Sequence, residues 1–289
     1  MRRLLIIGCG DVALRAIPLL RKRYRVFALL RDPAKCAALR ELGVQPLLGD
    51  LDDRNSLERI SGLADAVLHF APPPNNGVQD TRTQNLLSAL SQGKPPKHLV
   101  YISTSGVYGD CGGAWVNETH PLKTTSPRSQ RRVDAEMQVR IWARRNQVNA
   151  TILRVPGIYA ADRLPLGRVQ QGTPAIIASE DSYTNHIHAD DLARISIAAL
   201  QYGKSCRVYH ASDDSHLKMG EYFDNVADAF GLPRVPRISR AEAQNVLSEM
   251  LLSFMNESRR LTNRRMKREL RVVLSYPTVV DMLAAIKHS

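Results

Sequence analysis

The sequence predicts an α/β fold built on a doubly wound parallel sheet. Apolar segments of strand length alternate along the chain with segments of helical periodicity, which is the pattern of successive β-α-β units. The first apolar segment ends in a glycine-rich turn that opens a helix. The chain has 289 residues, more than a usual single domain, so we expect one full core and a smaller appendage.

Each predicted strand is a short run of apolar residues. The strands are expected at 4–7, 26–30, 45–48, 66–70, 99–102 and 151–155, followed later by 207–210. Leu14, Ile17, Leu19 and Leu20 indicate an amphipathic helix after the first strand.

Helix start signals appear after the later strands as well. Asp32 and Pro33 have the side chains of an N-cap and of a first helical position, so a helix should follow the second strand. A helical pattern over 78–90 follows a proline-rich break, and a second long helix is predicted over 127–145. Beyond Pro156 the periodicity becomes irregular, which indicates that residues 161–185 and 213–289 are additions outside the main sheet.

The turn after the first strand reads G-x-G-x-x-A. Gly8 permits a tight turn, Gly10 lets the backbone approach a phosphate, and Ala13 leaves room for the helix against the strand. With Asp11 and Val12, this turn would present free N–H groups to the pyrophosphate of a dinucleotide. A plain strand-ending turn is the alternative interpretation.

We therefore predict a Rossmann fold with a small C-terminal subdomain that faces the substrate. The NAD(P)-binding domain is expected over 1–160, its sheet completed by about 186–212, and a discontinuous appendage within 161–289. Arg31 ends the second strand, about 20 residues after the glycines, where a guanidinium meets the 2′-phosphate of NADP and an acid would hold the NAD ribose. NADP is the predicted cofactor, NAD the second choice, and a solvated Arg31 the alternative.

The formal net charge of +12 raises the question of nucleic-acid binding. Residues 259–271 hold seven basic residues and one acid, which suits a solvated helix face, a grip on a substrate phosphate, or a nucleic-acid patch. Because no aromatics interleave with them, we expect no specific nucleic-acid partner. We expect Asn263 and Tyr276 to be packed, and most of the guanidinium groups to lie at the surface.

The remaining composition predicts a cytoplasmic protein. Asp11 and Arg15 interrupt the first apolar run before it reaches the length of a signal peptide, and no segment is long enough to cross a membrane. The cysteines lack a C-x-x-C pair, so we expect reduced thiols and no metal site; they are Cys9, Cys36, Cys111 and Cys206. The sequence leaves the oligomeric state open, with a homodimer as one candidate.

Several segments resemble one family in their order along the chain. They are S-T-S-G-V-Y-G-D at 103–110, L-R-V-P-G-I-Y at 153–159, I-H-A-D-D-L-A at 187–193, and R-L-T-N at 260–263 with Tyr276-Pro277. This set resembles the extended short-chain dehydrogenase/reductases of the NAD-dependent epimerase/dehydratase family, of which the chain looks like an atypical member.

The resemblance implies roles for individual residues. In the cofactor site, Asp50 and Leu51 would flank the adenine, Phe70 and Ala71 would line the middle of the cofactor, and Pro156, Gly157 and Ile158 would lie near the nicotinamide. Thr104 occupies the place of the catalytic Ser/Thr, and Ser105, Tyr108 and His188 would face the substrate. Thr104 and His188 also have structural alternatives, as a hydroxyl that completes a strand end and as a histidine at a helix start.

The chain departs from the family at its proton-transfer residues. The family presents Tyr-x-x-x-Lys eight and four residues before a glutamate that here is Glu136, and those positions hold Arg128 and Arg132. A guanidinium stays protonated and cannot exchange the proton, although either arginine could hold an anionic group. The sequence therefore predicts an oxidoreductase or epimerase-like protein for a small polar, nucleotide-sugar-like substrate, with an altered catalytic site. A catalytically silent, NADP-binding redox sensor or regulator is the alternative.

Overall fold

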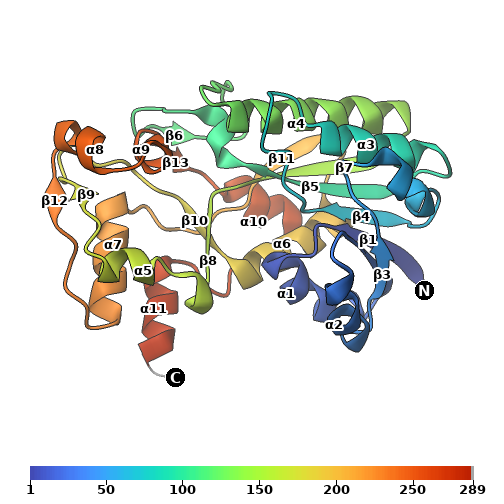
Figure 1. The fold of residues 1–289 in the computed structure, drawn as a ribbon, viewed down its shortest axis with the longest axis horizontal. Coiled ribbons are helices and arrows are strands. Elements are labelled where there is room, and N and C mark those ends of the chain that lie inside the picture. Colours follow the sequence, from blue (N-terminus) through green and yellow to red (C-terminus); the bar gives the residue numbers. More distant parts are fainter. Residues whose placement is uncertain (288–289) are drawn as a thin grey trace.

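The computed structural model describes residues 1–287 and confirms the predicted α/β fold (Figure 1). Its centre is a seven-stranded sheet of order β11-β7-β5-β4-β1-β2-β3, in which every neighbouring pair is parallel. The strands are β1 (Arg2–Ile7), β2 (Tyr24–Leu30), β3 (Gln45–Leu48), β4 (Ala66–His69), β5 (His98–Thr104), β7 (Asn149–Val155) and β11 (Arg207–His210).

The strand order reverses at β1, which pairs with β2 on one side and with β4 on the other. Leu4, Leu5, Ile6 and Ile7 are fully buried, as expected for a central strand covered on both faces. Ligands of open α/β sheets bind where the strand order reverses, beyond the carboxyl ends of the strands. The architecture therefore places the Gly8 turn at the expected binding edge.

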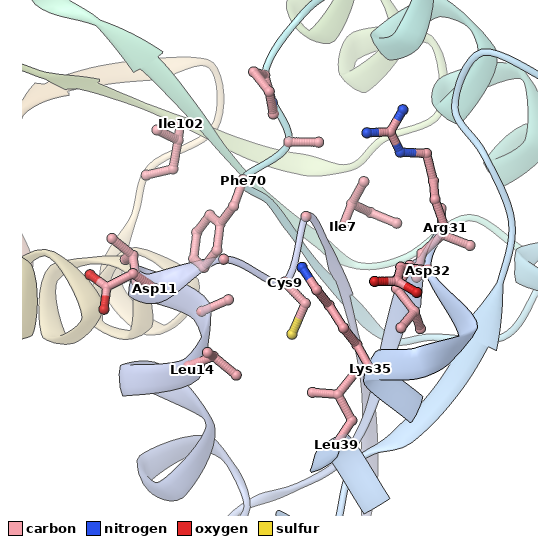
Figure 2. Close-up of a pocket in the computed structure, with 18 of the residues that line it drawn as sticks. Ile7, Cys9, Asp11, Leu14, Arg31, Asp32, Lys35, Leu39, Phe70 and Ile102 are labelled. Carbon is pink, nitrogen blue, oxygen red and sulfur yellow. The ribbon is translucent and has the colours of Figure 1, made fainter. Parts of the chain in front are cut away.

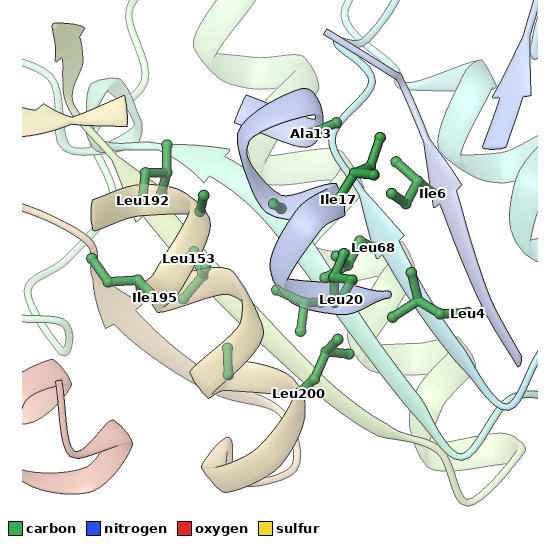
Figure 3. Close-up of a cluster of buried hydrophobic side chains, with 14 of the residues drawn as sticks. Leu4, Ile6, Ala13, Ile17, Leu20, Leu68, Leu153, Leu192, Ile195 and Leu200 are labelled. Atoms are coloured by element: carbon green, nitrogen blue, oxygen red, sulfur yellow. The ribbon is translucent and has the colours of Figure 1, made fainter. Parts of the chain in front are cut away.

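Helices cover both faces of the sheet (Figure 1). One core cluster lies under α1 and α6, where Leu4, Ile6, Ile17, Leu192 and Leu200 meet (Figure 3). The helices on this face are α1 (Asp11–Leu20), α2 (Cys36–Glu41), α6 (Ala189–Tyr202) and α10 (Arg264–Leu270). The opposite face carries η2 (Arg54–Ile60), α3 (Thr81–Ser91) and α4 (Pro127–Arg145).

The predicted helix start after β2 is confirmed, and one predicted helix face is partly wrong. The Asp32 carboxylate accepts a hydrogen bond from the Ala34 N–H, and Pro33 begins η1 (Pro33–Lys35), which leads into α2. In α1, however, Leu14 and Leu19 are 42% and 40% exposed. The buried face of this helix consists instead of two alanines and two larger apolar residues: Ala13, Ala16, Ile17 and Leu20.

A second lobe is assembled from segments that are far apart in the sequence. Its own core contains Tyr159, Phe223, Val226, Met282 and Leu283. The lobe comprises β8 (Gly157–Tyr159), η4 (Ala161–Arg163), α5 (Leu166–Gln170), β9 (Ala175–Ile176), β10 (His186–His188), α7 (Met219–Ala229), β12 (Arg237–Ile238), α8 (Arg240–Val246), α9 (Glu249–Met255) and α11 (Val279–Lys287).

Three small parallel pairings tie distant segments together. They are β8 with β10, β9 with β12, and β6 (Trp115–Val116) with β13 (Arg260–Leu261). Of the predicted completion at 186–212, β11 is the strand that joins the central sheet, whereas β10 pairs outside it.

The basic stretch 259–271 differs from its prediction, because only three of its seven basic residues are exposed: Arg264, Arg268 and Arg271. Arg259 is 8% exposed and donates to the Gly109 carbonyl, and Lys267 pairs with Asp214 at 2.6 Å. Nearby carbonyl and carboxylate acceptors therefore draw much of the stretch into the fold.

The two residues expected to be packed near this stretch are indeed packed. Asn263 is buried, and its side-chain amide donates to the Ser212 carbonyl at 2.9 Å. Tyr276 is partly buried against the core of the second lobe.

The described residues also bear on metals and membranes. All four cysteines are free, and no group of three or more His, Cys, Asp or Glu side chains within 1–287 has the arrangement of a metal site. No helix in the same range is both long and apolar enough to span a membrane.

Candidate functional site

A cavity of about 800 Å³ lies over the strand ends at the reversal point of the sheet (Figure 2). It extends from Arg31 and Lys35 on one side to Ile102 on the other. Pro156 and Gly157 do not line this cavity, although Ile158 beside them does. The predicted cofactor residues that line it are Gly8, Gly10, Asp11, Val12, Arg31, Asp50, Leu51, Phe70, Ala71 and Ile158.

The glycine turn fits a dinucleotide phosphate group. Gly8 has a φ of +88°, and a Cβ added there would lie 2.5 Å from the Ala71 nitrogen. A Cβ added at Gly10 would meet no protein atom within 4 Å, so the space beside Gly10 is open. The first turn of α1 begins at the next residue and directs its N–H groups to this edge. Backbone geometry and open space therefore both suit a bound phosphate.

A cluster of charges borders the glycine turn. The Asp11 carboxylate accepts hydrogen bonds from Arg15 Nε at 2.9 Å and from Arg163 Nη1 at 3.0 Å. Partial burial raises the pKa of Asp11, but the two arginines lower it more, so the net shift is downward. Arg163 also lines the cavity. Sequence patterns did not reveal this residue, because η4 is remote from the glycine turn along the chain.

The other end of the cavity is basic. The Arg31 side chain is 66% exposed and its Nη1 lies 3.9 Å from the Asp50 carboxylate. Lys35, at the end of η1, is a second cation in the lining that was not predicted (Figure 2). The sequence could have indicated Lys35, because it lies two residues after Pro33, in the first turn that follows β2. Asp32, also in the lining, is engaged as a helix cap, as predicted.

The predicted catalytic turn follows β5 directly as η3 (Ser105–Tyr108). The Thr104 hydroxyl accepts a hydrogen bond from the Gly106 N–H at 3.2 Å, which caps this turn. Thr104 is half-buried, and Ser105 is 4% exposed. Thr104 therefore has the structural role of a hydroxyl that completes the strand end. Its oxygen is the acceptor in this capping hydrogen bond.

Tyr108 corrects one predicted substrate contact. Its side chain is fully buried, and its hydroxyl lies 2.6 Å from His210 Nε2 and accepts from Arg154 at 2.7 Å. Burial raises the pKa of Tyr108 to about 12. Tyr108 is therefore a packing residue behind the turn, without surface for a substrate.

His188 is likewise held by structural contacts. It is 4% exposed, and its Nδ1 accepts the Asp190 N–H at 3.2 Å at the start of α6. Its ring centre lies 4.1 Å from that of Tyr276. Burial lowers the pKa of His188, although Asp190 opposes that shift. A neutral helix-capping imidazole accounts for these contacts.

The two arginines predicted to stand in place of Tyr and Lys lie on α4. Arg132 donates to the Ile102 carbonyl at 2.8 Å and to the Tyr101 hydroxyl at 3.1 Å, so it binds the end of β5. Partial burial lowers the pKa of Arg128; the neighbouring Arg132 lowers it further, and Glu257 opposes that shift. Neither arginine, nor Thr104, lines the cavity.

Two carboxylates lie near this turn, and neither was predicted to belong to the site. A Cβ added at Gly106 would lie 3.9 Å from Glu257 Oε2, and Glu257 pairs with Arg259 at 2.9 Å. Behind the turn, Glu136 and Arg154 form a buried ion pair at 2.7 Å, with side chains 3% and 4% exposed. Glu257 approaches through the late return of the chain to β6, which local patterns do not reveal.

The cavity thus reaches Ile102 in β5, and the turn that carries the Thr104 hydroxyl begins at the end of the same strand. Arg128 offers a positive charge on the neighbouring helix, but it stays protonated at ordinary pH and cannot act as a general acid or base. The open space at the glycine turn suits a phosphate, and the charge of Arg128 can attract an anionic group.

Comparisons with known proteins bear on the family and the fold. A family model described as the NAD dependent epimerase/dehydratase family matches residues 16–211. A dTDP-glucose 4,6-dehydratase from Mycolicibacterium smegmatis is 28% identical over 180 residues, which cover 55% of this chain and 54% of that protein. The match thus spans about half the length of that curated relative.

Solved structures resemble the whole chain. A conserved protein of unknown function from Silicibacter pomeroyi is 29% identical with a TM-score of 0.81, covering 100% of this chain and 99% of that one. A double mutant of the dTDP-glucose 4,6-dehydratase DesIV from Streptomyces venezuelae, solved with NAD bound, has a TM-score of 0.79 at 21% identity. That match covers 99% of this chain and 96% of the other, and it shows the shared fold.

Proposed function

The chain belongs to the NAD-dependent epimerase/dehydratase family, and on that premise we propose that it is an NADP-binding oxidoreductase or epimerase-like protein for a small polar substrate. The observation that carries the proposal is the cavity that connects the Gly8 turn with Arg31 at one end and Ile158 at the other. A dinucleotide bound there would have its phosphates at the start of α1. When bound, the nicotinamide ring supplies the acceptor or donor of a hydride.

The preference for NADP rests on two cations at the end of β2. Arg31 is exposed and Lys35 lines the same part of the cavity, so both are available to a 2′-phosphate. Asp32 uses one of its carboxylate oxygens to cap η1, so the helix start competes with a ribose hydroxyl for this carboxylate. Asp50 lies 3.9 Å from Arg31 and would keep that guanidinium near the cavity rim.

Titration with NADPH and NADH tests the proposal. We expect NADPH to bind at least tenfold more tightly, because a charge-assisted contact contributes about 1.5–3 kcal/mol. Arg31→Ala and Lys35→Ala should each weaken NADPH binding and leave NADH binding nearly unchanged. Arg40→Ala, an exposed change on the adjoining α2 outside the cavity lining, serves as the control. Equal affinities for the two dinucleotides in the wild type would refute the NADP assignment.

The substrate proposed is a small polar molecule of the nucleotide-linked sugar class. Support comes from the dTDP-glucose 4,6-dehydratases among the relatives and from Arg128, whose charge would attract a phosphate of such a substrate. The Thr104 hydroxyl oxygen accepts the Gly106 N–H, and its hydrogen would be donated to the reacting oxygen of the substrate.

The catalytic site is proposed to be altered. The family positions for a proton-carrying Tyr and its Lys hold Arg128 and Arg132, and Arg132 is engaged with the end of β5. These features also support the second candidate, a protein that binds NADP as a sensor or regulator without turnover. Hydride transfer to a panel of carbonyl substrates with NADPH distinguishes the two candidates.

A further inference from the structure

We propose that Arg163 binds the cofactor pyrophosphate and thereby couples the second lobe to cofactor occupancy. This inference rests on the proposed dinucleotide function. Arg163 ends η4, the short turn that follows β8 in the second lobe. Its side chain lines the same cavity as Gly8 and Gly10, which belong to the turn after β1.

One contact across the cavity rim holds Arg163 near the glycine turn. Its Nη1 lies 3.0 Å from Asp11 Oδ2, and Asp11 is the first residue of α1. The Arg163 side chain is 38% exposed, so it has room to adjust. A guanidinium carries five N–H donors, and the contact with Asp11 uses one nitrogen. Arg163 can therefore contact a phosphate oxygen while it keeps Asp11.

The local charges explain why such a residue is needed. Asp11 places a carboxylate at the helix start, where a pyrophosphate would bring further negative charge. Arg15 also contacts Asp11, but its other nitrogens donate to Asp190 at 2.9 Å and to Asp162 at 3.0 Å. Arg15 is thus shared among three carboxylates. Arg163 is the neighbouring cation that can offset the repulsion between Asp11 and the phosphates.

The same contact links two parts of the molecule. Arg163 lies four residues beyond the end of β8, and Ile158 within that strand lines the cavity. A phosphate held by Arg163 would therefore fix the segment that carries Ile158. The edge of the second lobe that borders the cavity would be fixed with it.

Binding measurements on the full chain test this inference. We expect Arg163→Ala to weaken NADPH binding by about tenfold or more, as for the loss of a charge-assisted hydrogen bond, and Arg163→Lys to lose less. Binding of 2′-AMP, which carries the 2′-phosphate but no pyrophosphate, should stay unchanged. Arg234→Ala removes an exposed arginine that pairs with Asp228 at 2.7 Å, away from the cavity lining, and serves as the control.

A second variant separates direct contact from charge compensation. In an Asp11→Asn background, Arg163→Ala should still weaken NADPH binding, because the phosphate contact is lost even when position 11 carries no charge. Thermal unfolding of each variant checks that the fold is retained. Equal NADPH affinity with and without Arg163 in either background overturns the inference, as does an equal loss for NADPH and 2′-AMP.

Amide hydrogen exchange tests the link to the second lobe. NADPH should slow exchange over residues 158–163 in the wild type, and it should do so much less in Arg163→Ala at a saturating concentration. Equal protection in the two proteins would overturn the coupling. If the wild type binds dinucleotide and Arg163→Ala binds it equally well, this inference alone is refuted. If the wild type binds no dinucleotide, the proposed function is refuted.

Discussion

The two glycines of the first turn are required for different physical reasons. Gly8 has a positive φ, and an added Cβ would lie 2.5 Å from the Ala71 backbone. Gly10 has an extended backbone, and an added Cβ would meet no protein atom within 4 Å. The protein itself therefore excludes a side chain at position 8, whereas only a bound phosphate would exclude one at position 10.

This difference predicts opposite results for two matched variants. Gly10→Ala should fold with nearly wild-type stability but bind NADPH more weakly, because its methyl group enters the phosphate space. Gly8→Ala should lower the free energy of unfolding by at least about 1–2 kcal/mol, the cost of the left-handed backbone alone. Urea denaturation and dinucleotide titration measure both quantities. Unchanged NADPH affinity in Gly10→Ala would contradict the placement of the phosphate.

The proposed replacement of Tyr and Lys by Arg128 and Arg132 gives a prediction about catalysis. The wild type should bind dinucleotide but transfer little hydride on carbonyl or sugar-nucleotide substrates, because loss of a general acid/base costs roughly 10²–10⁴-fold. Arg128→Tyr combined with Arg132→Lys should raise the rate. The Arg132 change also removes contacts with the end of β5, so Arg132→Lys alone is the control for structural effects. Ordinary enzymatic rates in the wild type that persist in Thr104→Ala would contradict the prediction.

At the scale of elements, the strands could be predicted because each is a compact apolar run between turn signals. The start of η1, which leads into α2, could be predicted from Asp32 and Pro33 because they act locally. The buried face of α1 was partly misjudged, because alanines fill the narrow space against the sheet while Leu14 lies at the cavity. Arg163 and Glu257 could not be predicted in this way, since their positions depend on contacts between distant segments.

The ion pair between α4 and β7 gives a prediction about stability. Glu136 contacts Arg154 through both carboxylate oxygens, at 2.7 and 3.0 Å, and also accepts from the Ser103 hydroxyl. Glu136→Gln leaves a buried guanidinium without its counter-charge and should cost about 3–5 kcal/mol in the free energy of unfolding.

A double variant tests the cause of that loss. Glu136→Leu with Arg154→Met removes both charges, so it should lose less stability than Glu136→Gln alone. Urea denaturation of the wild type and the variants gives the comparison. A double variant less stable than the single one would show that shape and the Tyr108 contact, rather than the uncompensated charge, dominate at this position.

At the scale of the whole molecule, Asp213 stands at the junction between the sheet and the second lobe. It is 3% exposed, its N–H donates to the His186 carbonyl at 2.8 Å, and its carboxylate accepts from the Ser215 N–H at 2.9 Å. Burial raises the pKa of Asp213 to about 7, against the opposing hydrogen bond from Ser215. The junction therefore holds a carboxyl group that prefers its neutral form.

This pKa predicts how stability depends on pH. An unfolded aspartate loses its proton near pH 4, whereas folded Asp213 keeps it to about pH 7. Between these values the folded state binds more protons, so this group's contribution to stability falls as pH rises, by at most about 1.4 kcal/mol per pH unit. Asp213→Asn should gain stability relative to the wild type from about pH 5 to about pH 7. Parallel stability profiles for the two proteins, measured by urea denaturation, would contradict the shift.

The pairing of β6 with β13 has a consequence for the order in which the protein matures during its synthesis. The loop after the Thr104 turn is held by Arg259, Ser258 and β13, which the ribosome makes after every strand of the central sheet. The nascent chain can pair those strands and form its glycine turn while the loop beside Thr104 still lacks these partners. Every residue that lines the cavity is therefore made before the segment that completes the neighbouring Thr104 turn, which must wait until the last part of the chain has emerged.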